Sequence, residues 1–235
     1  MITCLNNATI GAASLEGFIE AAGIAGFAAV EVGLGNVATY VADHSLATFK
    51  EALIERGLLL GSVGLPVDWQ GQEGRFTSDM DAVAEYLALC KELGLSRLCT
   101  WIPPRWDTPY AETLAFVKER LSVVADALSQ YDITLGLEFV APQGNFLSRR
   151  YKFISTLSET RHLIDVMRRD NVGLLLDSYH LYVSETPLSE IAALPADMIV
   201  QVHVNDAYPC VPKEELEDLK RLLPGEGAIP LVPML

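Results

Sequence analysis

Hydrophobic positions along the chain form short runs, and each run is followed by a stretch in which apolar residues recur at helical spacing. The runs are rich in Leu, Val and Ile, which is typical of strands covered on both faces. The pattern repeats about every 30 residues, the length of one strand-helix unit. The seven strands predicted in this way are Ile2–Leu5, Ala28–Val32, Leu58–Val63, Leu98–Ile102, Ile133–Val140, Val172–Leu176 and Ile199–Val204.

The stretches between the runs carry helix signals. One helix face is predicted by the series Leu114, Val117, Leu121, Val124 and Leu128, and the pair Thr108–Pro109 predicts where that helix starts. Ser78 and Asp81 are spaced like a capping box that opens an earlier helix, which Gly94 would end. Thr156 with Glu159 predicts a third helix start, and Gly57 predicts a helix end.

Repeated alternation of strand and helix predicts an α/β fold with parallel strands and right-handed crossovers. Two architectures satisfy it, an open doubly wound sheet and a (β/α)8 TIM barrel. The turn after the first run, CLNNATIGAAS, lacks the glycine pattern that an open nucleotide-binding sheet carries there. Polar residues instead gather at the C-terminal ends of several runs, where barrels place their chemistry. We therefore expect a single TIM-barrel domain over residues 1–235, in which no eighth strand follows the seventh run.

Composition narrows the class of protein. Half of the residues are hydrophobic, and 17 basic against 31 acidic residues give a net charge of −14. This balance argues against a nucleic-acid or anionic-membrane surface, both of which attract basic proteins. No apolar stretch is long enough for a membrane span, and the N-terminus lacks the features of a signal peptide. The four cysteines show no metal or disulfide spacing, so we expect reduced core thiols and a cytoplasmic protein.

Three late strands end in ionisable residues: Glu138, Asp177 and His203. In the fifth run Glu138 alternates with Leu and Phe, and in the seventh His203 alternates with Val, so each points away from the apolar face. A buried ion pair could explain any one of the three. Together they form a mixed oxygen and nitrogen set suited to a divalent metal, namely Mn, Mg, Co or Zn, with positions open for substrate.

Further candidates lie near these strand ends. His180 follows Asp177 by one helical turn and could contact substrate, bind metal or cap the turn. Trp101 could wall a sugar-sized pocket, and Arg150 could bind a substrate phosphate or carboxylate. Glu226, in the segment GEG, is a loop residue that we include as a candidate substrate contact. Asp206 points opposite to His203 and could support a loop turn or the surroundings of the site.

The segments GLEFVAP, NVGLLLDSYHLY, VQVHVND and LLPGEGAI resemble the xylose-isomerase-like TIM-barrel superfamily of sugar and sugar-phosphate isomerases and epimerases. The resemblance implies one divalent metal held by Glu, Asp, His and a second Glu. Glu138, Asp177 and His203 would be three of these ligands, and His180 would contact the substrate. It also implies proton transfer next to a carbonyl through an enediolate, with Glu138 and His180 as the catalytic residues.

Two positions depart from the family pattern. The second Glu belongs to the eighth strand, which does not appear before the sequence reaches VPML. Some epimerases carry an Arg six residues after the metal His, where this chain has Pro209. A barrel without its closing strand exposes two sheet edges, which a second copy in a homo-oligomer could cover.

The leading functional hypothesis is therefore a metal-dependent isomerase or epimerase of a sugar or sugar phosphate. The alternatives are a lyase of the inosose-dehydratase kind, and a barrel that binds sugar or metal without turnover. A DNA-repair endonuclease of the same superfamily is disfavoured, because it needs more histidine ligands and a basic face than a chain with four histidines and a charge of −14 provides.

Overall fold

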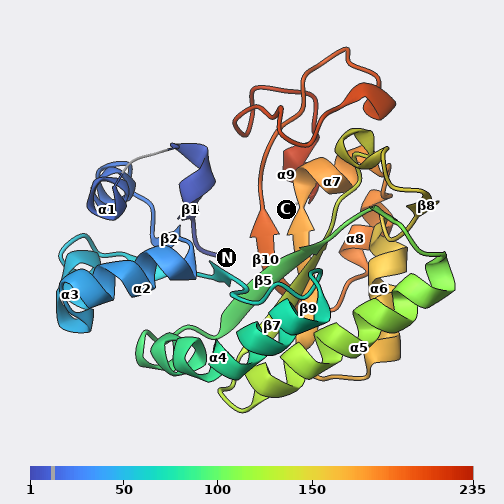
Figure 1. Cartoon of the computed structure of the whole chain (residues 1–235). Coiled ribbons are helices and arrows are strands. Elements are labelled where there is room, and N and C mark those ends of the chain that lie inside the picture. The colour runs from blue at the N-terminus through green and yellow to red at the C-terminus, as the bar shows by residue number, and fades with distance from the viewer. Residues whose placement is uncertain (12–13, 235) are drawn as a thin grey trace. The chain divides into compact units, whose positions relative to one another are not determined.

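The computed structural model describes residues 1–11 and 14–234. Contacts between residues group the chain into two compact units. The first comprises Met1–Cys99 and Ala127–Ile133, and the second comprises Thr100–Asp126 and the chain from Thr134 onward. Both units alternate strands and helices (Figure 1), which confirms the α/β class. That the chain forms one domain stays a prediction.

The first unit contains a parallel sheet of three strands in the order β1-β2-β3, with Leu5 opposite Val30 and Ala29 opposite Leu59. Its helix α3 begins at the Ser45 cap, and Gly57 follows its end with a φ of 65°, as the sequence predicted. The elements of this unit are β1 (Cys4–Asn6), η1 (Asn7–Thr9), α1 (Leu15–Ile24), β2 (Ala29–Glu31), α2 (Leu34–Asp43), α3 (Leu46–Ile54), β3 (Leu59–Leu60), β4 (Val63–Gly64), α4 (Glu73–Glu92) and the first half of β5 (Arg97–Ile102).

The run Leu58–Val63, predicted as one strand, forms two. β3 pairs with β2, and Gly61 still donates its N–H to the carbonyl of Val30. β4 then pairs with β5 through Val63 and Leu98. The apolar run continues across both pieces although Leu59 is exposed and Val63 is buried. The backbone changes hydrogen-bonding partner within the run, and hydrophobicity alone does not report that change.

Helix α4 starts earlier than the predicted capping box. It begins at Glu73 with Gln72 as its cap, so Ser78 lies inside the helix and the prediction was wrong. Phe76 is buried and extends the apolar face by one turn. Asp79, one turn after Phe76 on the same side of the helix, accepts a hydrogen bond from the Asp68 N–H and pairs with Arg75. These contacts hold the extra turn. Gly94 follows the helix end with a φ of 71°, as predicted.

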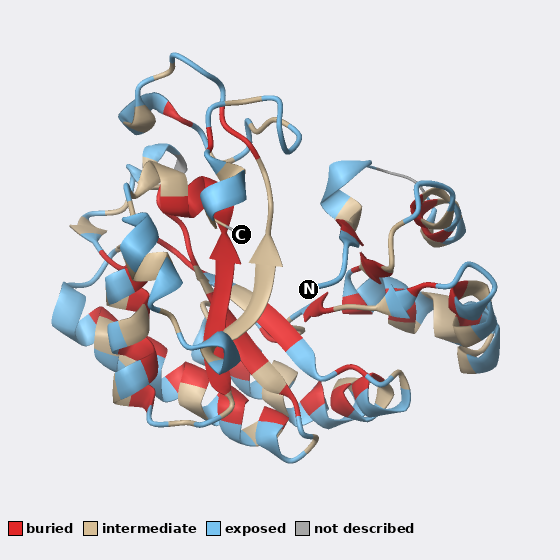
Figure 2. Cartoon of the chain, turned by 180° about the vertical axis from the view of Figure 1, so that it is seen from behind, coloured by how far each residue is buried: buried red, intermediate tan, exposed pale blue. Residues whose placement is uncertain are grey.

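The second unit contains parallel strands in the order β10-β9-β7, with Leu135 opposite Val172 and Asp177 opposite His203. β9 is buried along its whole length, whereas β10 is half-buried (Figure 2). The elements of this unit are the second half of β5, β6 (Arg105–Trp106), α5 (Tyr110–Ser129, whose last residues belong to the first unit), β7 (Thr134–Phe139), η2 (Gly144–Phe146), β8 (Tyr151–Lys152), α6 (Leu157–Met167), β9 (Val172–Asp177), α7 (Ser178–Val183), α8 (Leu188–Ala192), η3 (Ala196–Met198), β10 (Ile199–His203), η4 (Lys213–Glu215) and α9 (Leu231–Met234).

Local sequence explains the helix starts in this unit. Thr156 caps α6 by accepting from the Glu159 N–H, and the Glu159 carboxylate accepts in return from the Ser155 N–H. This confirms the predicted helix start at Thr156. Helix α5 starts directly after Pro109, whose carbonyl accepts from the Thr113 N–H. Among the described residues after β10 there is no further strand, only the isolated bridge between Asp206 and Leu222.

Two sequence expectations concern the whole chain. All four cysteines are free, but only Cys90 and Cys99 are buried, so the expectation of core thiols is wrong for Cys4 and Cys210, which are exposed. Among the described residues, no helix combines the length and the apolar composition needed to cross a bilayer.

Candidate functional site

Three neighbouring parallel strands bring Glu138, Asp177 and His203 together. Glu138 lies in β7, and Asp177 and His203 are the last residues of β9 and β10, directly opposite each other in the register. His203 Nδ1 lies 3.6 Å from Glu138 Oε1 and 3.9 Å from Asp177 Oδ2. The side-chain parity read from the sequence therefore predicted a real convergence.

Asp177 is the most constrained member of the site, with 1% of its surface exposed. Its Oδ1 caps helix α7 by accepting from the Tyr179 N–H at 2.7 Å. Its Oδ2 accepts from Asn205 Nδ2 at 3.1 Å and from Arg221 Nη1 at 2.7 Å. The carboxylate thus ends a strand, starts a helix and pairs with a guanidinium, and these partners offset the free-energy cost of burying a charge.

The short helix α7 carries His180 into the same place. His180 Nε2 lies 3.9 Å from Glu138 Oε1 and 3.5 Å from Asp218 Oδ1. The residue is buried, and its Nδ1 has no hydrogen-bond partner among the described residues. Leaving a buried polar nitrogen without a partner costs free energy, and such atoms concentrate at functional sites. We call Glu138, Asp177, His180 and His203 the four-residue cluster.

The ring of His203 is oriented by its own strand. Its Nε2 lies 3.1 Å from the Gln201 side-chain amide, two residues earlier on the same face of β10. The contact atom of Gln201 is its amide nitrogen, which can only donate, so Nε2 of His203 accepts and Nδ1 carries the hydrogen that faces the two carboxylates. A cation at Nδ1 would take the place of that hydrogen.

Two residues of the site were not found from the sequence, Asp218 and Arg221. Arg221 Nη1 donates to Asp177, and Nη2 donates to Asp218 Oδ1 at 2.7 Å and lies 3.3 Å from His180 Nε2. The guanidinium carbon also lies 4.7 Å from the centre of the Tyr179 ring. Both residues belong to an irregular loop with no periodicity, so no sequence signal marked them.

The charges of the site perturb one another. Burial raises the pKa of the Asp177 carboxyl, but the facing charges of His180, Arg221 and His203 lower it by more, so the net pKa lies below the ordinary value. Burial lowers the pKa of Arg221, and the carboxylates of Asp177 and Asp218 raise it by more. Asp177 and Arg221 are therefore both ionised, as an ion pair requires.

The donor set fits a divalent cation. Glu138, Asp177 and His180 each offer one ligand atom, and these atoms lie within 4.8 Å of one another. His203 approaches the same two carboxylates. Two carboxylates and two imidazoles are the ligands that Zn, Mn and Co share, and Mg takes the carboxylates. Arg221 partly neutralises Asp177, so an incoming cation would share that carboxylate with a guanidinium.

The other candidates from the sequence lie outside the cluster. Trp101, in β5, is 41% exposed, and its ring centre lies 6.0 Å from that of Phe146. The guanidinium of Arg150 lies over the Tyr151 ring at 5.1 Å, and Glu226 is exposed. Among the described residues, neither Arg150 nor Glu226 forms a hydrogen bond or ion pair with a member of the cluster. Their roles in substrate binding stay predictions.

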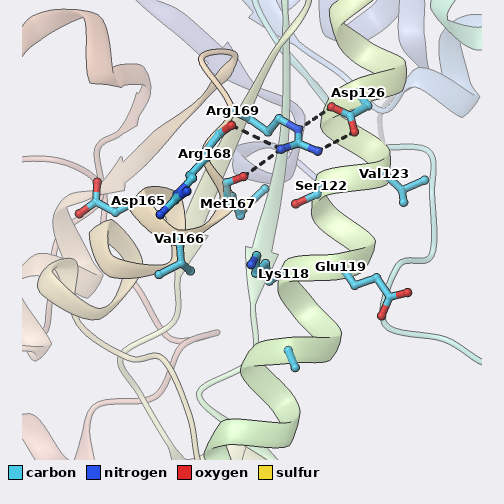
Figure 3. Close-up of a pocket in the computed structure, with 11 residues that line it drawn as sticks. Lys118, Glu119, Ser122, Val123, Asp126, Asp165, Val166, Met167, Arg168 and Arg169 are labelled. Atoms are coloured by element: carbon cyan, nitrogen blue, oxygen red, sulfur yellow. Dashed lines mark hydrogen bonds and ion pairs between the residues drawn. The ribbon is translucent and has the colours of Figure 1, made fainter.

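A groove of about 890 Å³ lies elsewhere in the second unit, between α5 and the end of α6 (Figure 3). Of its charged side chains, Arg169 and Asp126 pair with each other. Arg169 donates to both oxygens of Asp126 and to the carbonyl of Met167. The groove contains no histidine and none of the predicted site residues, so it does not compete with the cluster as the chemical site.

Parallel strand-helix units with carboxylates and imidazoles at the C-terminal ends of the strands define an α/β barrel protein with a candidate metal centre. The chain belongs to the xylose isomerase-like TIM barrel family, whose sequence profile matches residues 19–235. This confirms both the resemblance and the predicted barrel class.

Solved structures agree with this assignment. A xylose isomerase domain protein from Alicyclobacillus acidocaldarius has a TM-score of 0.91 and 30% identity, over 99% of this chain and 82% of that one. The zinc-bound IolI protein has a TM-score of 0.82 with 22% identity, over 99% of this chain and 82% of that one, and shows the fold alone.

A curated relative from Bacillus subtilis, named inosose isomerase, is 30% identical over 112 residues. The match covers 47% of this chain and 37% of the relative, so this chain matches well under half of the length of that protein.

Proposed function

We propose that this protein is a divalent-metal-dependent isomerase or epimerase of a small sugar, sugar phosphate or cyclic polyol ketone. The observation that carries the proposal is the four-residue cluster, in which two carboxylates and two imidazoles converge at adjacent strand ends. Relatives named inosose isomerase and the zinc in the IolI structure support the same class of reaction.

Glu138, Asp177 and His203 would hold the metal, which could be Mn, Mg, Co or Zn. When bound, such a cation supplies positive charge that stabilises the negative charge developing on a substrate carbonyl oxygen. Gln201 and Asn205 would keep the His203 ring and the Asp177 carboxylate in position. The alternative ligand set replaces His203 by His180, and Glu138 and Asp177 belong to both sets.

Glu138 is the residue best suited to move the proton. Its side chain is 15% exposed, whereas that of Asp177 is 1% exposed and both Asp177 oxygens already accept hydrogen bonds. Glu138 would take the proton from the carbon next to the carbonyl, leaving an enediolate, and return it to the neighbouring carbon on the same face. Epimerisation would need a second acid on the opposite face to deliver a proton there. His180 would act through Nε2, the nitrogen that faces Glu138, by holding a substrate oxygen.

The test separates metal binding from proton transfer. We expect one metal ion per chain after reloading with each candidate cation, measured by elemental mass spectrometry. In D₂O, we expect deuterium to enter ketoses, their phosphates or inososes next to the carbonyl, followed by NMR. Compared at equal metal content, Glu138→Gln should slow this exchange by about 100- to 10,000-fold. Asp126→Asn, which removes a paired carboxylate outside the site, is the matched control.

The possible results discriminate between the functional classes. A dehydrated product would support the lyase alternative, and metal binding without any deuterium exchange would support a binding protein. Absence of metal binding by the wild-type protein would contradict the proposal. His203→Ala and His180→Ala identify the imidazole that ligates, because only the loss of a ligand should weaken metal affinity by about 100-fold.

A further inference from the structure

The loop that carries Arg221 and Asp218 is tied to the end of β10 by one buried carboxylate. This loop, residues 207–229, is called the Asp206 loop. Asp206 Oδ1 accepts from the N–H groups of Ala207 and Ile229 at 2.9 and 2.8 Å. Asp206 Oδ2 accepts from those of Gly225 and Gly227, both at 3.0 Å. Asp206 is 1% exposed, so four backbone donors converge on a carboxylate shielded from water.

The backbone of Asp206 reinforces the same closure. Its N–H donates to the Leu222 carbonyl and its carbonyl accepts from the Leu222 N–H, both at 2.9 Å. Ala228 donates to the carbonyl of Ala207 at 3.0 Å. Both ends of the Asp206 loop are therefore fastened to the residues that closely follow the metal-facing His203, and Leu222 is the immediate neighbour of Arg221.

The glycines of the segment GEG fit this arrangement. A Cβ on Gly227 would overlap the carbonyl oxygen of Ala207 and lie 2.5 Å from Asp206 Oδ1. Gly225 adopts a φ of 93°, which residues with a side chain rarely adopt. The chain comes close enough to donate to Asp206 only because these positions lack side chains. The four bonds outweigh burial and lower the pKa of the Asp206 carboxyl, which keeps it ionised.

The interior of the loop shows what the closure positions. Arg221 contacts Asp177 and His180, and Asp218 contacts His180. Tyr179, which directly precedes His180 on α7, donates its hydroxyl to the Glu217 carbonyl at 2.8 Å. Asp206 itself makes no hydrogen bond or ion pair with a member of the four-residue cluster among the described residues.

We propose that Asp206 is a positioning residue, which fastens the Asp206 loop so that Arg221 and Asp218 are presented to Asp177 and His180. The inference rests on the proposed function only in naming the cluster as the site. Removing the carboxylate charge should loosen the loop and release the guanidinium of Arg221, while leaving the strands that carry Glu138, Asp177 and His203 in place.

The first variant is Asp206→Asn, which places an amide against four backbone donors. The second and milder variant is Gly225→Ala, which disfavours the backbone conformation in which the residue 225 N–H donates to Asp206. Glu214→Gln is the matched control, because Glu214 is an exposed carboxylate of the same loop. In the metal-free protein, hydrogen exchange at residues 225, 227 and 229 should rise about tenfold in both variants, because opening of the loop becomes easier. Exchange in β7 and β9 should not change, which shows that the fold is kept.

The state of Arg221 is read by ¹⁵N NMR of its guanidinium. In the wild type and Glu214→Gln, hindered rotation should keep the Nη signals of Arg221 separate, and in Asp206→Asn and Gly225→Ala they should merge. Affinity for Mn²⁺ should rise at least about threefold in Asp206→Asn, because a positive charge moves away from Asp177. Arg221→Met should raise the affinity for Mn²⁺ by the same factor. The double variant Asp206→Asn/Arg221→Met should bind Mn²⁺ no more tightly than Arg221→Met alone.

Two results would overturn the inference: loop exchange that stays at the wild-type rate, and loop exchange that rises while the Arg221 signals stay separate. If the wild type binds no metal, the proposed function fails, but the NMR and exchange measurements still decide the role of Asp206. If metal binds and Arg221 is unaffected in Asp206→Asn, the positioning role fails and the proposed function stands.

Discussion

Two arginine-aspartate pairs in the second unit have similar local chemistry and different surroundings. Arg169 donates from Nε and Nη2 to the two oxygens of Asp126, in the groove between α5 and α6 (Figure 3). Arg221 donates to Asp177 at 2.7 Å inside the four-residue cluster. The side chains of Arg169 and Asp126 are 36% and 56% exposed, whereas Asp177 is 1% exposed.

Because the two pairs have similar hydrogen-bond geometry, the geometry of an ion pair does not by itself identify a functional site. The pKa of Asp126 is lowered chiefly by its hydrogen bond to Arg169, with water on the other side. In Asp177 burial opposes ionisation, and a guanidinium and two imidazoles are needed to overcome it. A carboxylate that keeps its charge against burial, beside a second carboxylate, is the arrangement that attracts a divalent cation.

The largest effect should come from Asp177→Asn. The amide oxygen can still cap α7, but the loss of charge removes a cation ligand and leaves Arg221 without its buried partner. We expect metal affinity to fall by about 100-fold or more, measured by calorimetric titration with Mn²⁺ and Zn²⁺. Asp126→Asn should leave the affinity unchanged. Equal losses in both variants would show that overall charge, rather than the site, attracts the metal.

The next effect concerns stability. Arg221→Met leaves the Asp177 charge buried without its guanidinium, which should cost about 3 kcal/mol of unfolding free energy and lower the Tm by about 6–12 °C. Arg169→Met should lower it by less than about 2 °C, because the pair is solvated. Thermal unfolding of both metal-free variants at pH 7 measures the contrast. A similar Tm for the two variants would remove the distinction between the pairs.

A smaller effect is expected from pH. The folded pKa of Asp177 lies below the unfolded value of about 3.9, so its stabilisation is complete above that value and is lost as the pH falls through the folded pKa. The Tm advantage of the wild type over Asp177→Asn should therefore shrink between pH 5 and pH 3. An advantage that grows on acidification would mean that Asp177 is protonated in the folded protein.

The smallest effect is the response of the surface pair to salt. Asp126 also has a lowered pKa and loses its contribution on acidification, with the same sign as Asp177. In about 1 M salt, screening over about 3 Å should abolish the small difference in acid stability between the wild type and Asp126→Asn. The difference in acid stability between the wild type and Asp177→Asn should persist in the same salt, because buried charges are screened much less.

Periodicity in the sequence was enough to predict the strand-end part of the site. Strand alternation placed Glu138 and His203 on the polar faces of their strands, and parallel packing brought those faces together with Asp177. Arg221 could not be predicted, because it lies 44 positions from Asp177 in a loop without periodicity. Its place depends on closure through Asp206 and two glycines, which is a tertiary effect. The start of α4 was missed for a similar reason, since Asp79 and Phe76 act through contacts outside the helix.

The hydrogen bonds of Asp177 have a consequence for denticity. Oδ1 is directed at the start of α7 and Oδ2 at Asn205 and Arg221, so the carboxylate plane cannot turn. A cation that approached Oδ2, the oxygen 3.9 Å from His203 Nδ1, would meet the two hydrogen bonds already made there, and the fixed carboxylate plane would disfavour a change between one-oxygen and two-oxygen coordination. Glu138 Oε1 lies 3.6 Å from His203 Nδ1 and 3.9 Å from His180 Nε2. At these distances neither imidazole holds the Glu138 carboxylate in one orientation by a hydrogen bond. Changes in coordination number during a catalytic cycle would therefore fall to Glu138.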